Sequence, residues 1–191
     1  MSSRTAILGG TFDPVHLGHL FVAEEVLDRF DYERVVFVPA HIPPHKSEVQ
    51  GASPAARCEM LALAIEGHSR FRLEIFEMDR GGVSFTIDTI RYFIESGSVS
   101  DRPGLVIGSD LVDGFESWRE VDEIERLTDI ILVRRPGSST TGFRRRHRII
   151  DNLELGISSH EVRERIRASR PFRFLLPEKV AGYIELNGLY R

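Results

Sequence analysis

Cysteine is almost absent from this chain, since Cys58 is the only one among 191 residues. A single thiol excludes a disulfide framework and is typical of a reducing compartment, so we expect a cytoplasmic location. Long apolar runs are also missing. The first residues lack the apolar stretch of a signal peptide, and no later run approaches the length of a membrane span. We therefore expect no membrane association.

A strong excess of either charge is missing as well. The formal net charge is −4, which argues against a surface that binds nucleic acid or an anionic membrane. Two glycine-rich phosphate motifs are absent too. Without a Gly-Lys-Ser/Thr string the chain is no obvious P-loop kinase, and without G-x-G-x-x-G it is no obvious dinucleotide-dependent dehydrogenase.

Apolar strands alternate with helices along the chain. Because most of the strands are apolar throughout, the pattern predicts a parallel sheet covered on both faces, a Rossmann-like, doubly wound α/β fold. The length and the lack of internal repeats favour one domain over 1–191, with a C-terminal helical part over roughly 157–191. The predicted strands are Thr5–Leu8, Arg34–Val38, Phe71–Phe76, Gly104–Ile107, Ile130–Val133 and Ile149–Leu153. The predicted helices are Leu17–Phe30, Pro54–Ile65, Thr86–Ile94, Val121–Leu127, Ser159–Ala168 and Pro177–Leu186.

A glycine turn leads from the first predicted strand into the first helix. The segment Gly9–His19 reads Gly-Gly-Thr-Phe-Asp-Pro-Val-His-Leu-Gly-His. Backbone N–H groups in such a turn approach anions, and the helix N-terminus adds a partial positive charge. His16 and His19 share a face of the first helical turn. The turn therefore predicts a phosphate cradle with two imidazole donors, the alternative being an ordinary turn with incidental histidines.

Polar residues follow five of the predicted strands, at the point where each strand ends. In an open parallel sheet, ligands bind at the carboxyl ends of the strands, near the point where the strand order reverses. Five such clusters are hard to explain by packing alone, so we expect a binding site at this edge. The clusters are Gly9–His19, Pro39–Lys46, Gly108–Asp110, Arg134 with Arg135, and Ile157–Arg163.

Three features each have a plain alternative. Ser158 and Ser159 open the helix that contains Arg163, and N-capping explains part of their role, while Arg163 is placed to reach an anion at that N-terminus. The basic run Arg144–Arg148 is better explained as a solvated surface loop than as a phosphate contact. Four histidines invite a zinc site, but their spacing is loose and no cysteine lies nearby, so we expect no metal ion held by the protein. These histidines are His16, His19, His41 and His45.

The first and last clusters resemble the motifs of a known family. Gly10–His19 resembles the (H/T)xGH signature of the nucleotidylyl transferases, and Ile157–Arg163 resembles their ISSTxIR motif, with His160 and Val162 departing from it. Nearly the whole chain resembles the bacterial nicotinate-nucleotide adenylyltransferases, although Ala40 and His41 replace a string that usually contains threonine. The further segments that carry this resemblance are Pro43–Lys46, Ser84–Thr89, Gly108–Asp110 with Trp118, Arg135–Gly137 and Leu176–Tyr190.

The resemblance implies adenylyl transfer from ATP to nicotinate mononucleotide, which gives deamido-NAD and pyrophosphate in NAD biosynthesis. It places Trp118 under the pyridine ring, which suits an indole face, the alternative being core packing. It assigns the nicotinate carboxylate to backbone amides near Thr86 and Trp118, and ribose hydroxyls to Asp110, for which a plain helix N-cap is the alternative. The implied catalytic residues are His16, His19, Lys46 and Arg163. The implied ATP-binding residues are Gly9, Gly10, Thr11, Phe12, Gly18, His19, Gly108, Asp110, Ile157, Ser158, Ser159 and Arg163. The implied nicotinate mononucleotide-binding residues are Lys46, Thr86, Trp118 and Arg135.

Such a reaction needs no protein nucleophile, because the mononucleotide phosphate itself attacks the α-phosphorus of ATP. Mg²⁺ is expected on the triphosphate, held mainly by phosphate oxygens and water. Two stretches are predicted to be mobile loops, Ala40–Ala52 and Pro136–Gly142, and the first is expected to order on the mononucleotide and bring Lys46 to a phosphate. The alternatives are a phosphopantetheine or nicotinamide mononucleotide adenylyltransferase and a non-catalytic nucleotide sensor. A homo-oligomer stays open.

Overall fold

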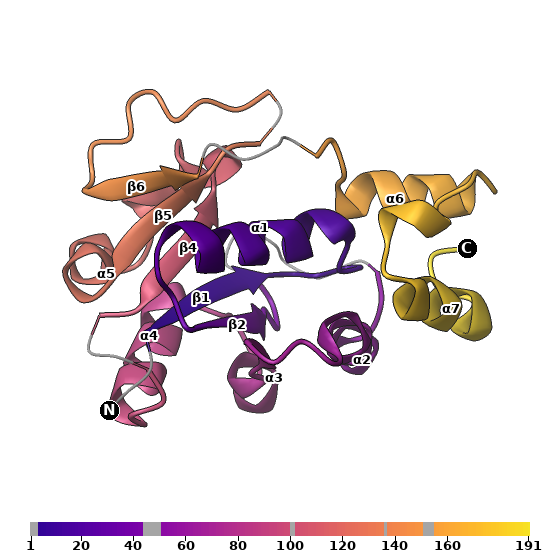
Figure 1. Cartoon of the computed structure of the whole chain (residues 1–191), viewed down its shortest axis with the longest axis horizontal. Coiled ribbons are helices and arrows are strands. Elements are labelled where there is room, and N and C mark those ends of the chain that lie inside the picture. Colours follow the sequence, from indigo (N-terminus) through magenta and orange to yellow (C-terminus); the bar gives the residue numbers. More distant parts are fainter. Residues whose placement is uncertain (1–3, 44–50, 100–101, 136, 151–154) are drawn as a thin grey trace.

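The structure is a computed structural model that describes residues 4–43, 51–99, 102–135, 137–150 and 155–191. A sheet of six parallel strands runs through its centre in the order β3-β2-β1-β4-β5-β6 (Figure 1). The strand order reverses between β1 and β4, which confirms the predicted doubly wound sheet and places a switch point there. The strands are β1 Thr5–Gly10, β2 Arg34–Pro39, β3 Phe71–Leu73, β4 Gly104–Gly108, β5 Asp129–Val133 and β6 His147–Ile150.

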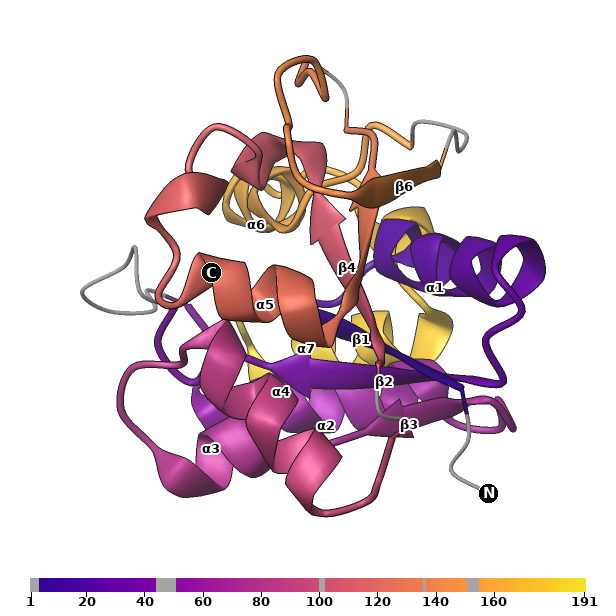
Figure 2. The ribbon, with the colours of Figure 1, turned by 90° about the vertical axis from the view of Figure 1, so that its left-hand side faces the viewer.

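Helices cover both faces of the sheet. Alternate residues of each strand point to opposite sides, and the apolar residues on both sides need to be buried. Ala6 and Leu8 of β1 belong to one hydrophobic core, and Ile7 belongs to the other. The first core packs under α1 (Leu17–Arg29), α2 (Pro54–Ile65), α6 (Ser159–Arg167) and α7 (Glu178–Asn187). The second packs under α4 (Thr86–Glu95) and α5 (Val121–Leu127), and Figure 2 shows α1 and α4 on opposite sides of the sheet.

Local sequence signals account for several helix ends. Ser53 caps α2 by accepting a hydrogen bond from the Ala56 N–H at 3.2 Å, and Pro54 is its first residue, as predicted. Pro177 is the N-cap of α7 rather than its first residue. Gly188 ends α7 in the left-handed region, at φ 59°, where glycine carries no Cβ penalty.

The predicted strand Phe71–Phe76 is too long. Pairing with β2 ends at Leu73, and the chain turns at Ile75 into a short helix, α3 (Phe76–Arg80), which ends at Gly81 with φ 68°. Of the two apolar residues that suggested a continuing strand, Ile75 is the N-cap of this helix and Phe76 is its first residue. The last predicted strand starts earlier than expected, at His147, and its predicted end over 151–153 lies outside the described residues.

The basic run Arg144–Arg148 is not a free surface loop. Arg145 is only 19% exposed and donates to the carboxylates of Glu116, Asp122 and Glu125, while the last two residues of the run enter β6. These ion pairs hold Arg145 against η2 (Phe115–Ser117) and α5. Arg144, Arg146 and Arg148 are exposed, so the solvated-surface interpretation holds for them and not for Arg145. Over the described ranges, no helix combines the length and apolar character that crossing a membrane requires.

Candidate active site

The turn after β1 is anchored by a buried aromatic ring. Phe12 has φ 49° and is 2% exposed, and its ring meets the His19 ring edge-on at 4.9 Å between centroids. A Cβ atom on Gly10 would come within 3.1 Å of the Phe12 ring, so glycine lets the strand end pass close to it. The turn leads into α1, whose N-cap is His16.

His16 and His19 lie one above the other at the start of α1. Their rings stack at 3.7 Å between centroids, and the His16 backbone N–H donates to Nδ1 of His19 at 3.2 Å. Because Nδ1 of His19 accepts this hydrogen bond, a neutral His19 carries its proton on Nε2. That N–H is therefore the one that His19 offers to a ligand.

Both imidazoles are held neutral near pH 7. Burial, followed by the positive charge of Arg135, lowers the pKa of His16 from 6.5 to about 3. Burial also lowers the pKa of His19 well below its ordinary value, and His16 and Arg135 add to this. The pair is therefore a pair of neutral imidazoles rather than two positive charges.

We expect this shift to make the protein sensitive to acid. Unfolded His16 binds a proton near pH 6.5, whereas the folded protein resists it until about pH 3, so the free energy of unfolding falls as the pH drops through that interval. His16→Asn keeps a residue that caps helices and removes the titration. Melting temperatures measured from pH 7 to 4 should fall more steeply for the wild type than for His16→Asn, and parallel curves would contradict the assignment.

The N-terminus of α6 docks onto the same turn. Ser159 Oγ donates to the Pro14 carbonyl at 2.9 Å, and Arg163 Nη1 donates to the Asp13 carbonyl at 2.6 Å. Ser158 caps α6 by accepting from the Glu161 N–H at 3.1 Å, which confirms the N-cap interpretation for that residue. Two helix N-termini, those of α1 and α6, thus lie together at the end of β1 (Figure 1), and both contribute positive potential there.

The end of β4 forms the other side of the switch point. A Cβ atom on Gly108 would displace Asp110 Oδ1 and Arg135 Nε from their present positions. Those two atoms form an ion pair at 3.1 Å. Asp110 sits inside the short helix η1 (Ser109–Leu111), whose N-cap is Gly108, so the helix N-cap alternative for Asp110 is wrong. Asp110 and Arg135, which the resemblance assigned to different substrates, contact each other.

Thr86 and Trp118 lie beside the second hydrophobic core. Thr86 begins α4, where the N–H groups of Asp88 and Thr89 donate to the carbonyl of the N-cap Phe85. The N–H groups of Thr86 and Ile87 precede the first helical hydrogen bond. Trp118 is partly buried, with its ring 4.9 Å from that of Phe115, so it is neither a full core residue nor free of the core. The backbone N–H of Trp118 donates to the Phe115 carbonyl at 3.0 Å, so this amide has a partner within the protein.

The structure brings together most, but not all, of the residues expected from the sequence. His16 and His19 lie where the β1 turn enters α1, and Ser159 and Arg163 contact the same turn from α6. The positive charge of Arg135 lowers the pKa of both imidazoles. Lys46 and His45 lie outside the described residues. Within the described ranges, no group of three or more histidine, cysteine or acidic side chains is arranged to hold a metal ion.

Sequence reasoning missed the residues that support the turn. Arg57 of α2 is fully buried and donates to the carbonyls of Thr11, Ala40 and His41 at 2.8, 2.7 and 3.2 Å. The sequence could have indicated this role, because Arg57 lies on the same face of α2 as the apolar residues Met60 and Leu61. An arginine on a buried face needs buried hydrogen-bond partners. Asp13 lies within the recognised turn but received no role.

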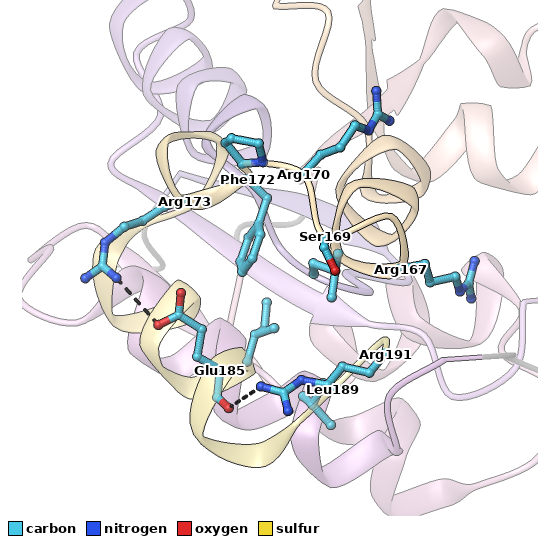
Figure 3. Close-up of a pocket in the computed structure, with 11 residues that line it drawn as sticks. Arg167, Ser169, Arg170, Phe172, Arg173, Glu185, Leu189 and Arg191 are labelled. Carbon is cyan, nitrogen blue, oxygen red and sulfur yellow. Dashed lines mark hydrogen bonds and ion pairs between the residues drawn. The ribbon is translucent and has the colours of Figure 1, made fainter.

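A separate pocket lies between the end of α6 and α7, with a volume of about 690 Å³. Figure 3 shows the Phe172 ring directed into it and the guanidinium groups of Arg167 and Arg170 directed away from it. None of the site residues expected from the sequence lines this pocket. It is therefore distinct from the site at the β1 turn.

A doubly wound sheet with two helix N-termini and paired histidines at its switch point defines a Rossmann-like nucleotide-binding protein. The cytidylyltransferase-like family model matches residues 7–165. The nicotinate-nucleotide adenylyltransferase of Bacillus subtilis is 38% identical over 188 residues, which cover 98% of each chain. The chain belongs to the cytidylyltransferase-like family of nucleotidyltransferases and, within it, to the nicotinate-nucleotide adenylyltransferases.

The solved structures agree on the fold. A Plasmodium falciparum nicotinic acid mononucleotide adenylyltransferase complexed with NaAD superposes with a TM-score of 0.80, over 98% of this chain and 97% of that one. The two sequences are 20% identical. A second structure of the parasite enzyme, complexed with APC, matches equally well.

Proposed function

We propose that the protein transfers the adenylyl group of ATP to nicotinate mononucleotide, giving deamido-NAD and pyrophosphate in NAD biosynthesis. The observation that carries this proposal is the pair of neutral histidines at two converging helix N-termini, in a chain related over its full length to an adenylyltransferase. The mononucleotide phosphate oxygen forms a bond to the α-phosphorus of ATP as the bond to pyrophosphate breaks. The protein aligns the reactants and stabilises developing charge.

The β1 turn and α6 bind ATP in this proposal. The Nε2–H of His19 donates to an oxygen of the transferring phosphate, and His16 lies behind it with Nδ1 buried and unpartnered within the described residues. The Arg163 guanidinium, anchored on the turn, neutralises a neighbouring phosphate. The glycines of the turn, with Thr11 and Ile157, let the triphosphate approach the backbone.

Mg²⁺ would be held by the phosphate oxygens of ATP and by water, and its charge would stabilise the leaving pyrophosphate. The only carboxylate in the β1 turn is that of Asp13, and its Oδ1 already accepts from the Ala52 N–H and the Tyr190 hydroxyl. The donors of the turn therefore fit an ion held by phosphate oxygens and water rather than by side chains.

Nicotinate mononucleotide lies towards α4. The carboxylate is read by the first N–H groups of that helix, at Thr86 and Ile87, where the helix dipole favours a negative charge. Asp88 in the same turn would repel it, but Arg80 pairs with Asp88 at 2.6 Å. Trp118 stacks on the pyridine ring, and Arg135 and Lys46 contact the mononucleotide phosphate.

The single cysteine supports a cytoplasmic location.

Product analysis tests the proposed function. Purified protein incubated with ATP, Mg²⁺ and nicotinate mononucleotide should form deamido-NAD and pyrophosphate in equal amounts. A protein that bound both substrates without forming product would instead be a nucleotide sensor. Conversion of phosphopantetheine in preference to nicotinate mononucleotide would identify the other adenylyltransferase class.

Replacing Trp118 tests the position of the pyridine ring. We expect Trp118→Ala to raise KM for nicotinate mononucleotide about tenfold, since stacking on a base is worth roughly 1–3 kcal/mol. Trp118→Phe retains an aromatic face and should lose less. Steady-state kinetics and thermal melting on both variants separate the two roles, because a lower melting temperature with unchanged KM would make Trp118 a core residue only.

A further inference from the structure

Asp13 connects the β1 turn to three other segments that are distant in sequence, through Ala52, Arg163 and Tyr190. Its Oδ1 accepts hydrogen bonds from the Ala52 N–H at 3.0 Å and from the Tyr190 hydroxyl at 2.7 Å. Its backbone carbonyl accepts from Arg163, as described above, and its Oδ2 lies 4.0 Å from Arg163 Nη1. Asp13 is 3% exposed, so these contacts are made away from bulk water.

The packing around this carboxylate leaves no free space on the side of Gly51. A Cβ atom on Gly51 would collide with the Asp13 carboxylate, so the chain entering α2 approaches Asp13 as closely as a backbone can. Burial and the Asp13 carboxylate together raise the pKa of the Tyr190 phenol, so its hydroxyl stays protonated and remains a donor. The contact between Tyr190 and Asp13 is therefore a charge-assisted hydrogen bond with little competing water.

The end of α7 determines where Tyr190 points. Gly188 adopts the left-handed conformation, and the Leu189 N–H bonds back to the Ile184 carbonyl at 3.1 Å, as in a Schellman turn. Tyr190 itself has φ 66°, a region that non-glycine residues occupy only when their surroundings hold them there. The turn thus sends the phenol from α7 back to the β1 turn.

Arg163 depends on the same anchor. Its Nε is buried without a hydrogen-bond partner in the described part of the chain, and the contacts that fix its guanidinium group are those to Asp13. A shift of Asp13 would therefore move Arg163 relative to His16 and His19. No described contact makes Tyr190 itself a ligand of the proposed substrates.

We propose that Tyr190 is a positioning residue for adenylyl transfer: its hydroxyl fixes the Asp13 carboxylate, and Asp13 in turn fixes Arg163 and the histidine-bearing turn. This inference rests on the proposed function for its effect on rate. Its structural part, the immobilisation of Asp13, is independent of any substrate.

Tyr190→Phe removes one hydroxyl and keeps the ring, and Tyr183→Phe on α7 is a matched control, because Tyr183 packs against the same core. With ATP and nicotinate mononucleotide, well below the melting temperature, we expect Tyr190→Phe to lower kcat about tenfold, because a less fixed Arg163 and β1 turn align the reacting phosphates less well. KM for the mononucleotide should change less than about twofold, because the acceptor site is not touched. Tyr183→Phe should match the wild type.

Amide hydrogen exchange supplies a second readout that needs no activity. The Ala52 N–H bonds to the same carboxylate oxygen, so its exchange should accelerate about tenfold in Tyr190→Phe and stay unchanged in Tyr183→Phe. A lower melting temperature with wild-type kcat, or unchanged Ala52 exchange, would overturn the proposal. If the wild type formed no deamido-NAD, the proposed function would fail, and the exchange result would still decide whether Tyr190 fixes Asp13.

Discussion

Replacing His19 by alanine should lower kcat for adenylyl transfer about a hundredfold or more, the loss typical of removing one preorganised donor to a developing negative charge. The structure identifies that donor as the Nε2–H, because Nδ1 accepts from the His16 backbone. A contact that strengthens as charge develops acts on the transition state more than on bound ATP. Most of the ATP affinity should therefore remain.

Single-turnover kinetics and ATP titration on His19→Ala check this expectation. His68→Ala is the matched control, because His68 also stacks on an aromatic ring, that of Phe71. His68 precedes β3 and so lies at the amino end of a strand, whereas His19 follows the carboxyl end of β1. The control should keep wild-type turnover. Near wild-type kcat in His19→Ala would show that His19 does not stabilise the transferring phosphate.

Arg57→Met should destabilise the protein by about 3–5 kcal/mol, because it leaves three carbonyls of the loops after β1 and β2 without their buried donor. Methionine keeps much of the length of the side chain, so the loss reports on hydrogen bonds and charge more than on volume. For a chain of this size the melting temperature should fall by roughly 10 °C.

Thermal and urea unfolding measure this loss. Arg29→Met is the control, since Arg29 is exposed on α1 and, among the described residues, forms its ion pair with Glu25 one turn away. Such a surface pair contributes less than about 1 kcal/mol. Equal melting temperatures for the Arg57 and Arg29 variants would mean that water replaces the Arg57 donors at little cost.

The sheet was predictable because its signals are local. Apolar runs such as Ile130–Val133 and capped helices such as Pro54–Ile65 can be identified from neighbouring residues alone. The helix α3 escaped prediction because it is short and follows an apolar strand without a break. The β1 turn was predictable for the same local reason, since its glycines and both histidines lie within eleven consecutive residues, 9–19.

The supporting contacts were not predictable, because they join distant segments. Nothing near Asp13 in the sequence indicates that Tyr190 donates to it, and the Asp110–Arg135 ion pair exists only once β4 and β5 lie side by side. The hydrogen bond from the Trp118 backbone N–H to the Phe115 carbonyl belongs to a tight turn that sequence pattern does not reveal. Such long-range contacts depend on tertiary packing, which local propensity does not encode.

The central claim, adenylyl transfer to nicotinate mononucleotide, is tested most directly by the ratio of kcat/KM values for nicotinate and nicotinamide mononucleotide, measured with ATP and Mg²⁺. In the proposed complex, backbone N–H groups at the start of α4 would form charge-assisted hydrogen bonds to the nicotinate carboxylate, worth about 1.5–3 kcal/mol, against about 1 kcal/mol for a neutral amide. We therefore expect the nicotinate substrate to be preferred at least about tenfold. Equal kcat/KM values for the two substrates, or a preference for the amide, would contradict the claim.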